Sequence, residues 1–157
     1  MVTWCNVVAV GASYSCPEEE VKARKAIICT DGASRGNPGP AAIGAIIKDE
    51  HNRLIARISQ RIGTTTNNQA EYRAIIAALE EAIRLGATHV ELNSDSELVV
   101  RQISGRYRVK NAALKPLYQQ VKRLQGLLEG CTVTHIPRWR NKEADKLTNA
   151  ALDLPVD

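Results

Sequence analysis

Apolar and polar residues alternate along this chain in two patterns, one typical of strands and one typical of helices. Strands are predicted where short apolar, β-branched runs end at turn residues, at 26–30, 43–48, 54–62, 88–92 and 132–136. Helices are predicted where apolar residues recur at steps of three and four, between Asn67 and Gly86 and over 96–103, 114–128 and 141–152. The first helix is the clearest, because Asn67 or Asn68 can cap its start and Gly86 lies just past its end.

The order of these elements, βββαβααβα, predicts the fold class. A polar segment, 49–53, separates the second and third strands, as expected for an antiparallel hairpin. The later strands return through helices, which gives a five-stranded mixed sheet flanked by helices, an α/β fold. A chain of 157 residues has the length of one domain. We assign this domain to residues 26–157.

Residues 1–25 do not continue this pattern and are interpreted as an N-terminal extension. Trp4 to Val10 can form a short strand, and Pro17 followed by three glutamates can open a helical turn. Neither feature indicates a role for the extension.

Composition narrows the class of protein further. Ile, Leu, Val and Ala are plentiful and Phe is absent, so an aliphatic core is expected. No apolar run approaches the roughly 18 residues that a membrane span needs, and the N-terminus lacks the charged-then-apolar order of a secretory signal. We expect a soluble, cytoplasmic monomer without an obligate protein partner.

The four cysteines are widely spaced and form no CxxC pair, so neither a zinc site nor a redox pair is indicated. They are Cys5, Cys16, Cys29 and Cys131. Reduced, structural thiols are the simplest interpretation, and a disulfide among them stays open.

Positive charge is concentrated in one segment. The net charge is +4 and the pI is about 9.0, which is compatible with a polyanionic partner but common among proteins without one. Residues 98–128 contain no acidic side chain, and Tyr107 and Tyr118 lie among basic residues, namely Arg101, Arg106, Arg108, Lys110, Lys115, Lys122 and Arg123. The charge alone favours a phosphate-binding surface and a solvated helix face about equally.

Four acidic residues are predicted at strand ends or in the first turns of helices, the positions where α/β domains commonly form their active sites. Asp31 is expected to end the first strand, and Asp95 follows the fourth; Glu71 and Asp145 are expected in the first turns of helices. Each acid alone is explained by helix capping or turn preference. Together, however, they would repel one another unless cations neutralised them, so they predict a site for oxygen-preferring ions such as Mg²⁺.

Four blocks that contain these acids carry a resemblance to a known family. They are Asp31-Gly32-Ala33-Ser34 with Gly36-Asn37-Pro38-Gly39-Pro40, then Thr66-Asn67-Asn68-Gln69-Ala70-Glu71, Ser94-Asp95-Ser96 and Asn141-Lys142-Glu143-Ala144-Asp145. In this order they resemble type 1 ribonuclease H (the ribonuclease HI family), over roughly residues 26–152. The resemblance implies a ribonuclease H-like fold and an endonuclease that hydrolyses the RNA strand of RNA/DNA hybrids.

The same resemblance implies a mechanism and its residues. Two Mg²⁺ ions, with Mn²⁺ as a substitute, would be held by Asp31, Glu71, Asp95 and Asp145, and cleavage would leave 5′-phosphate and 3′-hydroxyl ends. Substrate contacts are implied for Asn37, Thr66, Asn67 and Asn68. Of these, Thr66 matches a position that holds a DNA phosphate. The two adjacent asparagines would lie near the minor groove, where the 2′-hydroxyl marks RNA. Asn37 is also explained as a turn residue before Pro-Gly.

The chain departs from the best-known family members in three places. The segment between Asp95 and Asp145 is too short for their additional basic helix, and the basic run 101–123 is a candidate substitute. Arg138 occupies the loop position of a mobile histidine that helps product leave, as in a subgroup that uses arginine there, and His135, nearer the strand, is the alternative. An arginine cannot shuttle protons at neutral pH, so it would act through its charge. Glu97 replaces an amide beside the third acid.

Three other functions could explain the same residues. The first is a catalytically silent nucleic-acid-binding module. The second is another metal nuclease of the superfamily, such as a junction resolvase or a reverse-transcriptase-associated domain, and the third is a structural protein. The intact acids argue against the silent module, since an uncompensated acidic cluster is unfavourable. The segment Asn67-Asn68-Gln69 favours the enzymes that cut hybrids.

Overall fold

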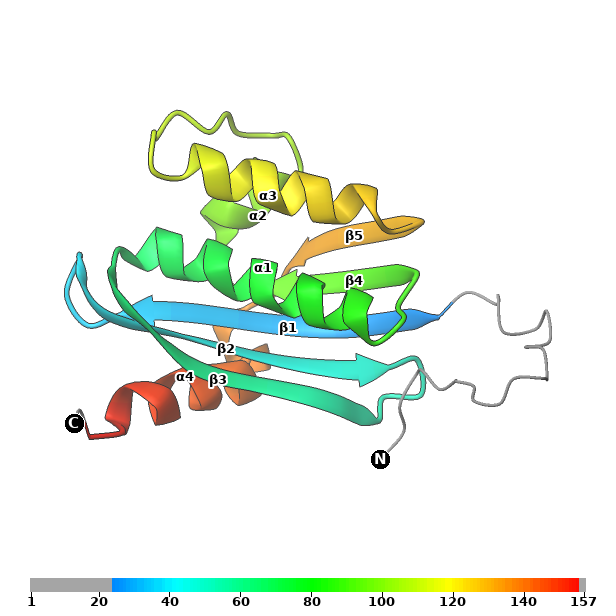
Figure 1. Cartoon of the computed structure of the whole chain (residues 1–157), viewed down its shortest axis with the longest axis horizontal. Coiled ribbons are helices and arrows are strands. Elements are labelled where there is room, and N and C mark those ends of the chain that lie inside the picture. Colours follow the sequence, from blue (N-terminus) through cyan, green and yellow to red (C-terminus); the bar gives the residue numbers. More distant parts are fainter. Residues whose placement is uncertain (1–23, 156–157) are drawn as a thin grey trace.

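The computed structural model describes residues 24–155 and contains a single sheet with helices on both faces (Figure 1). The strands are β1 (Lys25–Ser34), β2 (Gly39–Asp49), β3 (Leu54–Thr65), β4 (His89–Ser94) and β5 (Gly130–His135). The helices are α1 (Asn67–Arg84), α2 (Glu97–Ile103), α3 (Lys115–Gly126) and α4 (Lys142–Asp153), and a short 3-10 helix, Arg138–Arg140, precedes α4. This order confirms the predicted βββαβααβα arrangement.

The sheet has five strands in the order β3-β2-β1-β4-β5. β1 pairs antiparallel with β2 and parallel with β4, and β4 pairs parallel with β5. The predicted mixed sheet is therefore confirmed, with β1 at its centre. Within residues 24–155, no helix has both the length and the apolar character needed to cross a membrane.

The main core lies between the sheet and α1. Tyr72, Ile75 and Leu79 on α1 are fully buried against Ile28 of β1 and Leu92 of β4. Their spacing of three and four residues places them on one face of the helix, as the sequence pattern predicts. α4 covers the opposite face of the sheet (Figure 1), where it packs mainly on β2. The two helices fix the sheet from both sides.

The start of α1 differs from the prediction. Its N-cap is Thr66, not Asn67 or Asn68. The Thr66 hydroxyl accepts a hydrogen bond from the Gln69 backbone N–H at 3.2 Å, and the Gln69 side chain accepts one from the Thr66 N–H, also at 3.2 Å. This reciprocal capping box satisfies two backbone donors at once. A cap at Asn67 or Asn68 would forgo that pairing.

β1 is longer than predicted, which changes the place of Asp31. The strand does not end there; it continues to Ser34, which pairs with Ala41 of β2. The turn residues begin only at Arg35, so Asp31 lies inside the strand. A Cβ atom on Gly32 would lie 2.3 Å from the carbonyl of Ala70 in α1. Glycine is therefore needed here for close packing of strand and helix rather than to break the strand.

The features predicted for residues 1–23, the short strand from Trp4 and the helical turn at Pro17, lie outside the described residues, as do Cys5 and Cys16. Cys29 and Cys131 are free thiols and partly buried. Burial raises the pKa of both, which suits the predicted structural role.

Candidate active site

Three carboxylates from separate elements meet near the centre of the sheet. Asp31 lies on β1, Glu71 on α1 and Asp95 directly after β4. One carboxylate oxygen of each lies within 4.8 Å of the others. Glu71 was expected in the first turn of its helix. Because α1 starts at Asn67, Glu71 is the fifth residue and lies just past that turn.

Close backbone packing holds these groups together. The tight approach at Gly32 lets the Gly32 N–H donate a hydrogen bond to the Glu71 carboxylate. The next residue of α1, Tyr72, donates its buried hydroxyl to Gln102 Oε1 of α2 at 2.7 Å. Since α2 begins at Glu97, two residues after Asp95, this bond links the helix that carries Glu71 to the helix that follows Asp95.

Burial and mutual repulsion make the cluster costly when ionised. Burial raises the pKa of Asp31 to about 6, and the charges of Asp95 and Asp145 add to this effect; the Thr148 hydroxyl and the Arg138 guanidinium oppose it. Burial, followed by the charges of Asp31 and Asp95, raises the pKa of Glu71 well above its usual value. Perturbed carboxylates of this kind are typical of functional sites.

The cluster fits a divalent cation. In the described part of the chain, the oxygens Asp31 Oδ2, Glu71 Oε1 and Asp95 Oδ2 are buried without a hydrogen-bond partner. Unpaired buried oxygens are unfavourable, and three neighbouring carboxylates that each have one form a donor set that Mg²⁺ or Mn²⁺ prefers. Asp31, Glu71 and Asp95 are therefore the residues that could hold a metal.

Asp145 lies at the edge of this cluster. It is partly buried in the first turn of α4, as predicted, and close enough for its charge to raise the pKa of Asp31. It is not one of the three carboxylates whose oxygens lie within 4.8 Å of one another. The structure thus brings three predicted acids together and places the fourth nearby.

Sequence reasoning assigned no role to two residues that anchor α4. Buried Asn141 donates its side-chain N–H to the Thr30 carbonyl at 2.8 Å, and the buried Thr148 hydroxyl donates to the Asp31 carbonyl at 3.3 Å. Both bonds tie the helix to β1 beside the cluster. The available signal was a polar residue, Thr148, on the small-residue face that contains Ala144 and Ala151.

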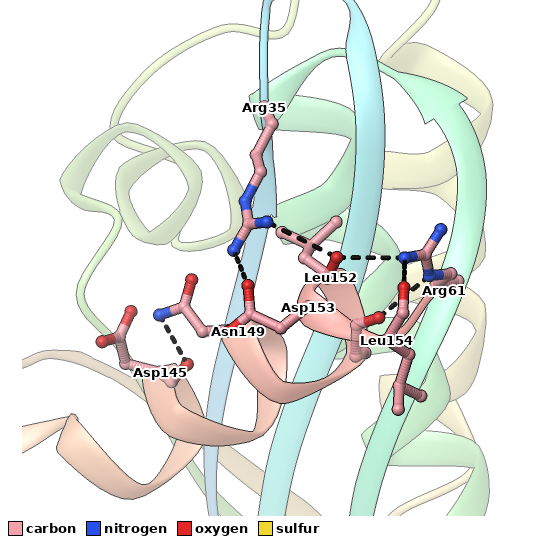
Figure 2. Close-up of polar contacts among 8 residues, drawn as sticks. Arg35, Arg61, Asp145, Asn149, Leu152, Asp153 and Leu154 are labelled. Atoms are coloured by element: carbon pink, nitrogen blue, oxygen red, sulfur yellow. Dashed lines mark hydrogen bonds and ion pairs between the residues drawn. The ribbon is translucent and has the colours of Figure 1, made fainter. Parts of the chain in front are cut away.

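The other end of α4 is held by two arginines (Figure 2). Arg35 bonds the carboxylate of Asp153 at 2.6 Å and the Leu152 carbonyl at 3.4 Å. Arg61 donates to the carbonyls of Ala151, Leu152 and Leu154. Positive charge at a helix C-terminus is favourable because it satisfies the last carbonyls. The helix that carries Asp145 is thus fixed at both ends.

The structure distinguishes the two candidates for the loop position before Asp145, which are Arg138 and His135. Arg138 lies in the 3-10 helix and is exposed, and its charge lowers the pKa of Asp31 and Glu71. His135 is the last residue of β5 and is also exposed. Arg138 is therefore the residue whose charge reaches the cluster.

Amide side chains cluster beyond the end of β1. Asn37 Oδ1 accepts a hydrogen bond from the Asn67 N–H at 2.9 Å, and Asn67 Oδ1 accepts one from the Ser34 N–H at 3.2 Å. These bonds use the oxygens and leave the amide N–H groups of both side chains for other partners. Thr66, as the N-cap, and Asn68 are partly buried beside them.

The basic segment begins at Arg101 on α2, the helix that follows Asp95 and its N-cap Ser96. The Arg101 guanidinium lies 5.3 Å from the Tyr107 ring, and Lys122 Nζ lies 5.7 Å from the Tyr118 ring. Glu97 forms an ion pair with Arg101 at 2.5 Å, so part of the charge is compensated within the protein. Both tyrosines are already in contact with a cation of the chain itself.

Fold and site together define an α/β domain with a carboxylate cluster suited to divalent cations. Residues 29–151 match the family described as "Reverse transcriptase-like". "Bifunctional protein Rv2228c" of Mycobacterium tuberculosis is 46% identical over 130 residues, which cover 82% of this chain and 36% of that protein. "Ribonuclease HI" of Halobacterium salinarum is 43% identical over 123 residues, 78% of this chain and 62% of that protein. The chain therefore spans about a third of the first relative and under two thirds of the second.

Solved structures agree with this assignment. The N-terminal RNase H domain of Rv2228c, solved as a fusion protein with maltose binding protein, superimposes with a TM-score of 0.80 at 45% identity, covering 82% of this chain and 99% of that one. LC11-RNase H1 in complex with RNA/DNA hybrid gives a TM-score of 0.78 at 44% identity, covering 82% and 96%. The chain belongs to the type 1 ribonuclease H family, which confirms the predicted family.

Proposed function

We propose that this protein is an endonuclease that hydrolyses the RNA strand of RNA/DNA hybrids and leaves 5′-phosphate and 3′-hydroxyl ends. The observation that carries the proposal is the set of three buried, unpartnered carboxylate oxygens on Asp31, Glu71 and Asp95. A relative solved with an RNA/DNA hybrid supports the choice of substrate.

The carboxylates would hold two Mg²⁺ ions, for which Mn²⁺ can substitute. When bound, such a pair supplies an activated water and neutralises the charge on the departing oxygen. Asp31, Glu71 and Asp95 provide the buried ligands, and Asp145 provides a carboxylate at the edge of the cluster. Arg138 contributes positive charge near the reacting phosphate, and it acts by electrostatics because its guanidinium stays protonated.

The asparagines beyond β1 are proposed to recognise the hybrid. Asn37 and Asn67 keep free amide N–H groups, and Asn68 lies beside them, which suits acceptor groups along the minor groove and the 2′-hydroxyl of RNA. Thr66 is proposed to contact a DNA phosphate close to the N-terminus of α1, where backbone N–H groups favour anions. The cytoplasmic location, the monomeric state and the domain boundary at residue 26 remain predictions.

The direct test is cleavage of an end-labelled RNA/DNA hybrid in Mg²⁺ or Mn²⁺, beside RNA/RNA and DNA/DNA duplexes. We expect metal-dependent cutting of the hybrid's RNA strand alone, lost in Asp95→Asn. Glu71→Gln and Glu80→Gln form a matched pair, because both residues lie on α1 and only the first belongs to the cluster. Binding of the hybrid without cutting in either metal would instead favour a silent nucleic-acid-binding module.

A further inference from the structure

An exposed tryptophan lies on the turn between β5 and α4. Trp139 lies in the 3-10 helix between Arg138 and Arg140, and 69% of its surface is accessible. This is the largest exposed fraction among the large hydrophobic side chains of residues 24–155. Within that range the indole has no hydrogen bond or ring contact, whereas Tyr107 and Tyr118 each contact a cation of the chain.

The turn that carries Trp139 is tied to both strands of the site. Before it, the N–H of buried Ile136 donates to the Ser94 carbonyl at 2.9 Å, one residue before Asp95. After it, buried Asn141 donates to the Thr30 carbonyl at 2.8 Å, one residue before Asp31. Hydrogen bonds within the turn, from Arg140 N–H to the Pro137 carbonyl and from Asn141 N–H to the Arg138 carbonyl, are both 2.9 Å. The exposed ring is therefore presented on backbone that is anchored at the active site.

The indole is flanked by two positive charges. Arg138 and Arg140 precede and follow Trp139 in the 3-10 helix, and both side chains are exposed. In a 3-10 helix, consecutive side chains project about 120° apart. The indole and the two guanidinium groups therefore project in three different directions from the turn.

We propose that Trp139 is a substrate-contact residue that packs its ring against the sugar and base edge of the nucleic-acid strand passing the carboxylates. The inference rests on the proposed function and adds to it a contact on the β5 side of the cluster. Aromatic packing on nucleotides tolerates any base, and positive charge on either side favours a polyanion over an apolar partner. The contact therefore strengthens binding without selecting sequence.

Fluorescence can observe this contact directly, since Trp4 and Trp139 are the two tryptophans of the chain. A full-length Trp4→Phe/Asp95→Asn protein retains one tryptophan and should not cut. We expect the red-shifted emission of an exposed indole in the free protein, and quenching on addition of an RNA/DNA hybrid. Anisotropy of a labelled hybrid reports binding independently. Binding without any change in emission overturns the contact, and so does a free protein whose indole emission is already that of a buried ring.

Kinetics provide the second readout. Trp139→Ala should raise KM for the hybrid about tenfold, equivalent to about 1.4 kcal/mol, and leave kcat within about twofold. Trp139→Tyr should restore most of the affinity, because a smaller ring still packs on nucleotides. Leu127→Ala is the matched control, since Leu127 is also a large exposed hydrophobic residue, 62% accessible, but lies at the end of α3. An unchanged KM in an active Trp139→Ala protein overturns the inference, whereas an inactive parent protein that does not bind the hybrid overturns the proposed function as well.

Discussion

Two aspartates with the same burial have opposite surroundings. Asp31 on β1 and Asp49 at the end of β2 are each 4% exposed. Asp49 Oδ1 accepts hydrogen bonds from the N–H groups of His51, at 2.8 Å, and Arg53, at 2.9 Å, and the Arg53 side chain lies 3.5 Å from Oδ2. Burial acts to raise the pKa of Asp49, but these hydrogen bonds and charges outweigh it, and the pKa is lowered.

Asp31 has the same burial without the same partners. Its Oδ2 atom has no hydrogen-bond partner in the described part of the chain, and the carboxylates of Glu71 and Asp95 each place an oxygen within 4.8 Å of an Asp31 oxygen. Burial therefore raises its pKa to about 6. The difference shows that burial alone does not mark a functional acid. Asp49 stabilises a turn through its hydrogen bonds, whereas the negative charge of ionised Asp31 is not compensated and would be stabilised by a bound cation.

The largest expected effect concerns activity. Removing the charge by Asp31→Asn should lower hybrid cleavage about 10³-fold, because the lost ligand stabilises the transition state. Asp49→Asn should keep activity within about twofold, since its partners are in the hairpin. Initial rates of both variants on one labelled hybrid check this, and equal losses would show that the comparison is wrong.

A second effect concerns the packing that brings Glu71 to Asp31. Gly32→Ala would place a methyl group 2.3 Å from the Ala70 carbonyl, which should separate β1 from α1 and destabilise the fold by about 3 kcal/mol. Gly126→Ala serves as the control, because nothing lies within 4 Å of its added Cβ and alanine favours helix by roughly 0.5–1 kcal/mol. Denaturant unfolding measures both. A Gly32→Ala protein of wild-type stability would contradict the assigned role of this close approach.

The two aspartates should also give opposite pH dependences in metal-free buffer. The folded-state pKa of Asp31, about 6, lies above its usual value of 3.8, so the folded protein binds more protons between these values and stability falls as pH rises through this range. Asp31→Asn should thus stabilise the protein by on the order of 1–3 kcal/mol at pH 7 and little at pH 4.

Asp49 has a lowered pKa in the folded state, so its contribution is present above its unfolded value and is lost as pH falls through the folded one. Asp49→Asn should therefore destabilise at pH 7 and converge with wild type in acid. Unfolding free energies measured from pH 4 to 8 with a chelator test both signs. Destabilisation by Asp31→Asn at pH 7 would refute this account of the cluster.

The smallest expected effect is stabilisation by Mg²⁺. Ligand at about ten times its Kd should stabilise the wild-type fold by about 1.4 kcal/mol, visible as a rise in Tm. The rise should persist in Asp49→Asn and be absent in Asp31→Asn. A Tm that responds equally in all three proteins would indicate that Mg²⁺ binds elsewhere.

Much of the fold could be predicted because its signals are local. The three- and four-residue spacing of Tyr72, Ile75 and Leu79 is a property of one helix, and the polar segment 49–53 is a property of one hairpin. The predictions were wrong where an interaction with another residue or strand fixes the boundary of an element. Thr66 caps α1 because its side chain and that of Gln69 bond each other's backbone N–H groups. β1 continues past Asp31 because β2 pairs with it as far as Ser34.

By itself, the sequence determined the element order and the identity of the acids, through periodicity and through blocks of neighbouring residues. Only the tertiary structure decided that Asp31, Glu71 and Asp95 meet while Asp145 stands at the edge, and that Trp139 is exposed on a turn anchored to β1 and β4. The reason is physical: burial, charge repulsion and unpaired oxygens depend on distances between segments far apart in the chain, which no local pattern encodes.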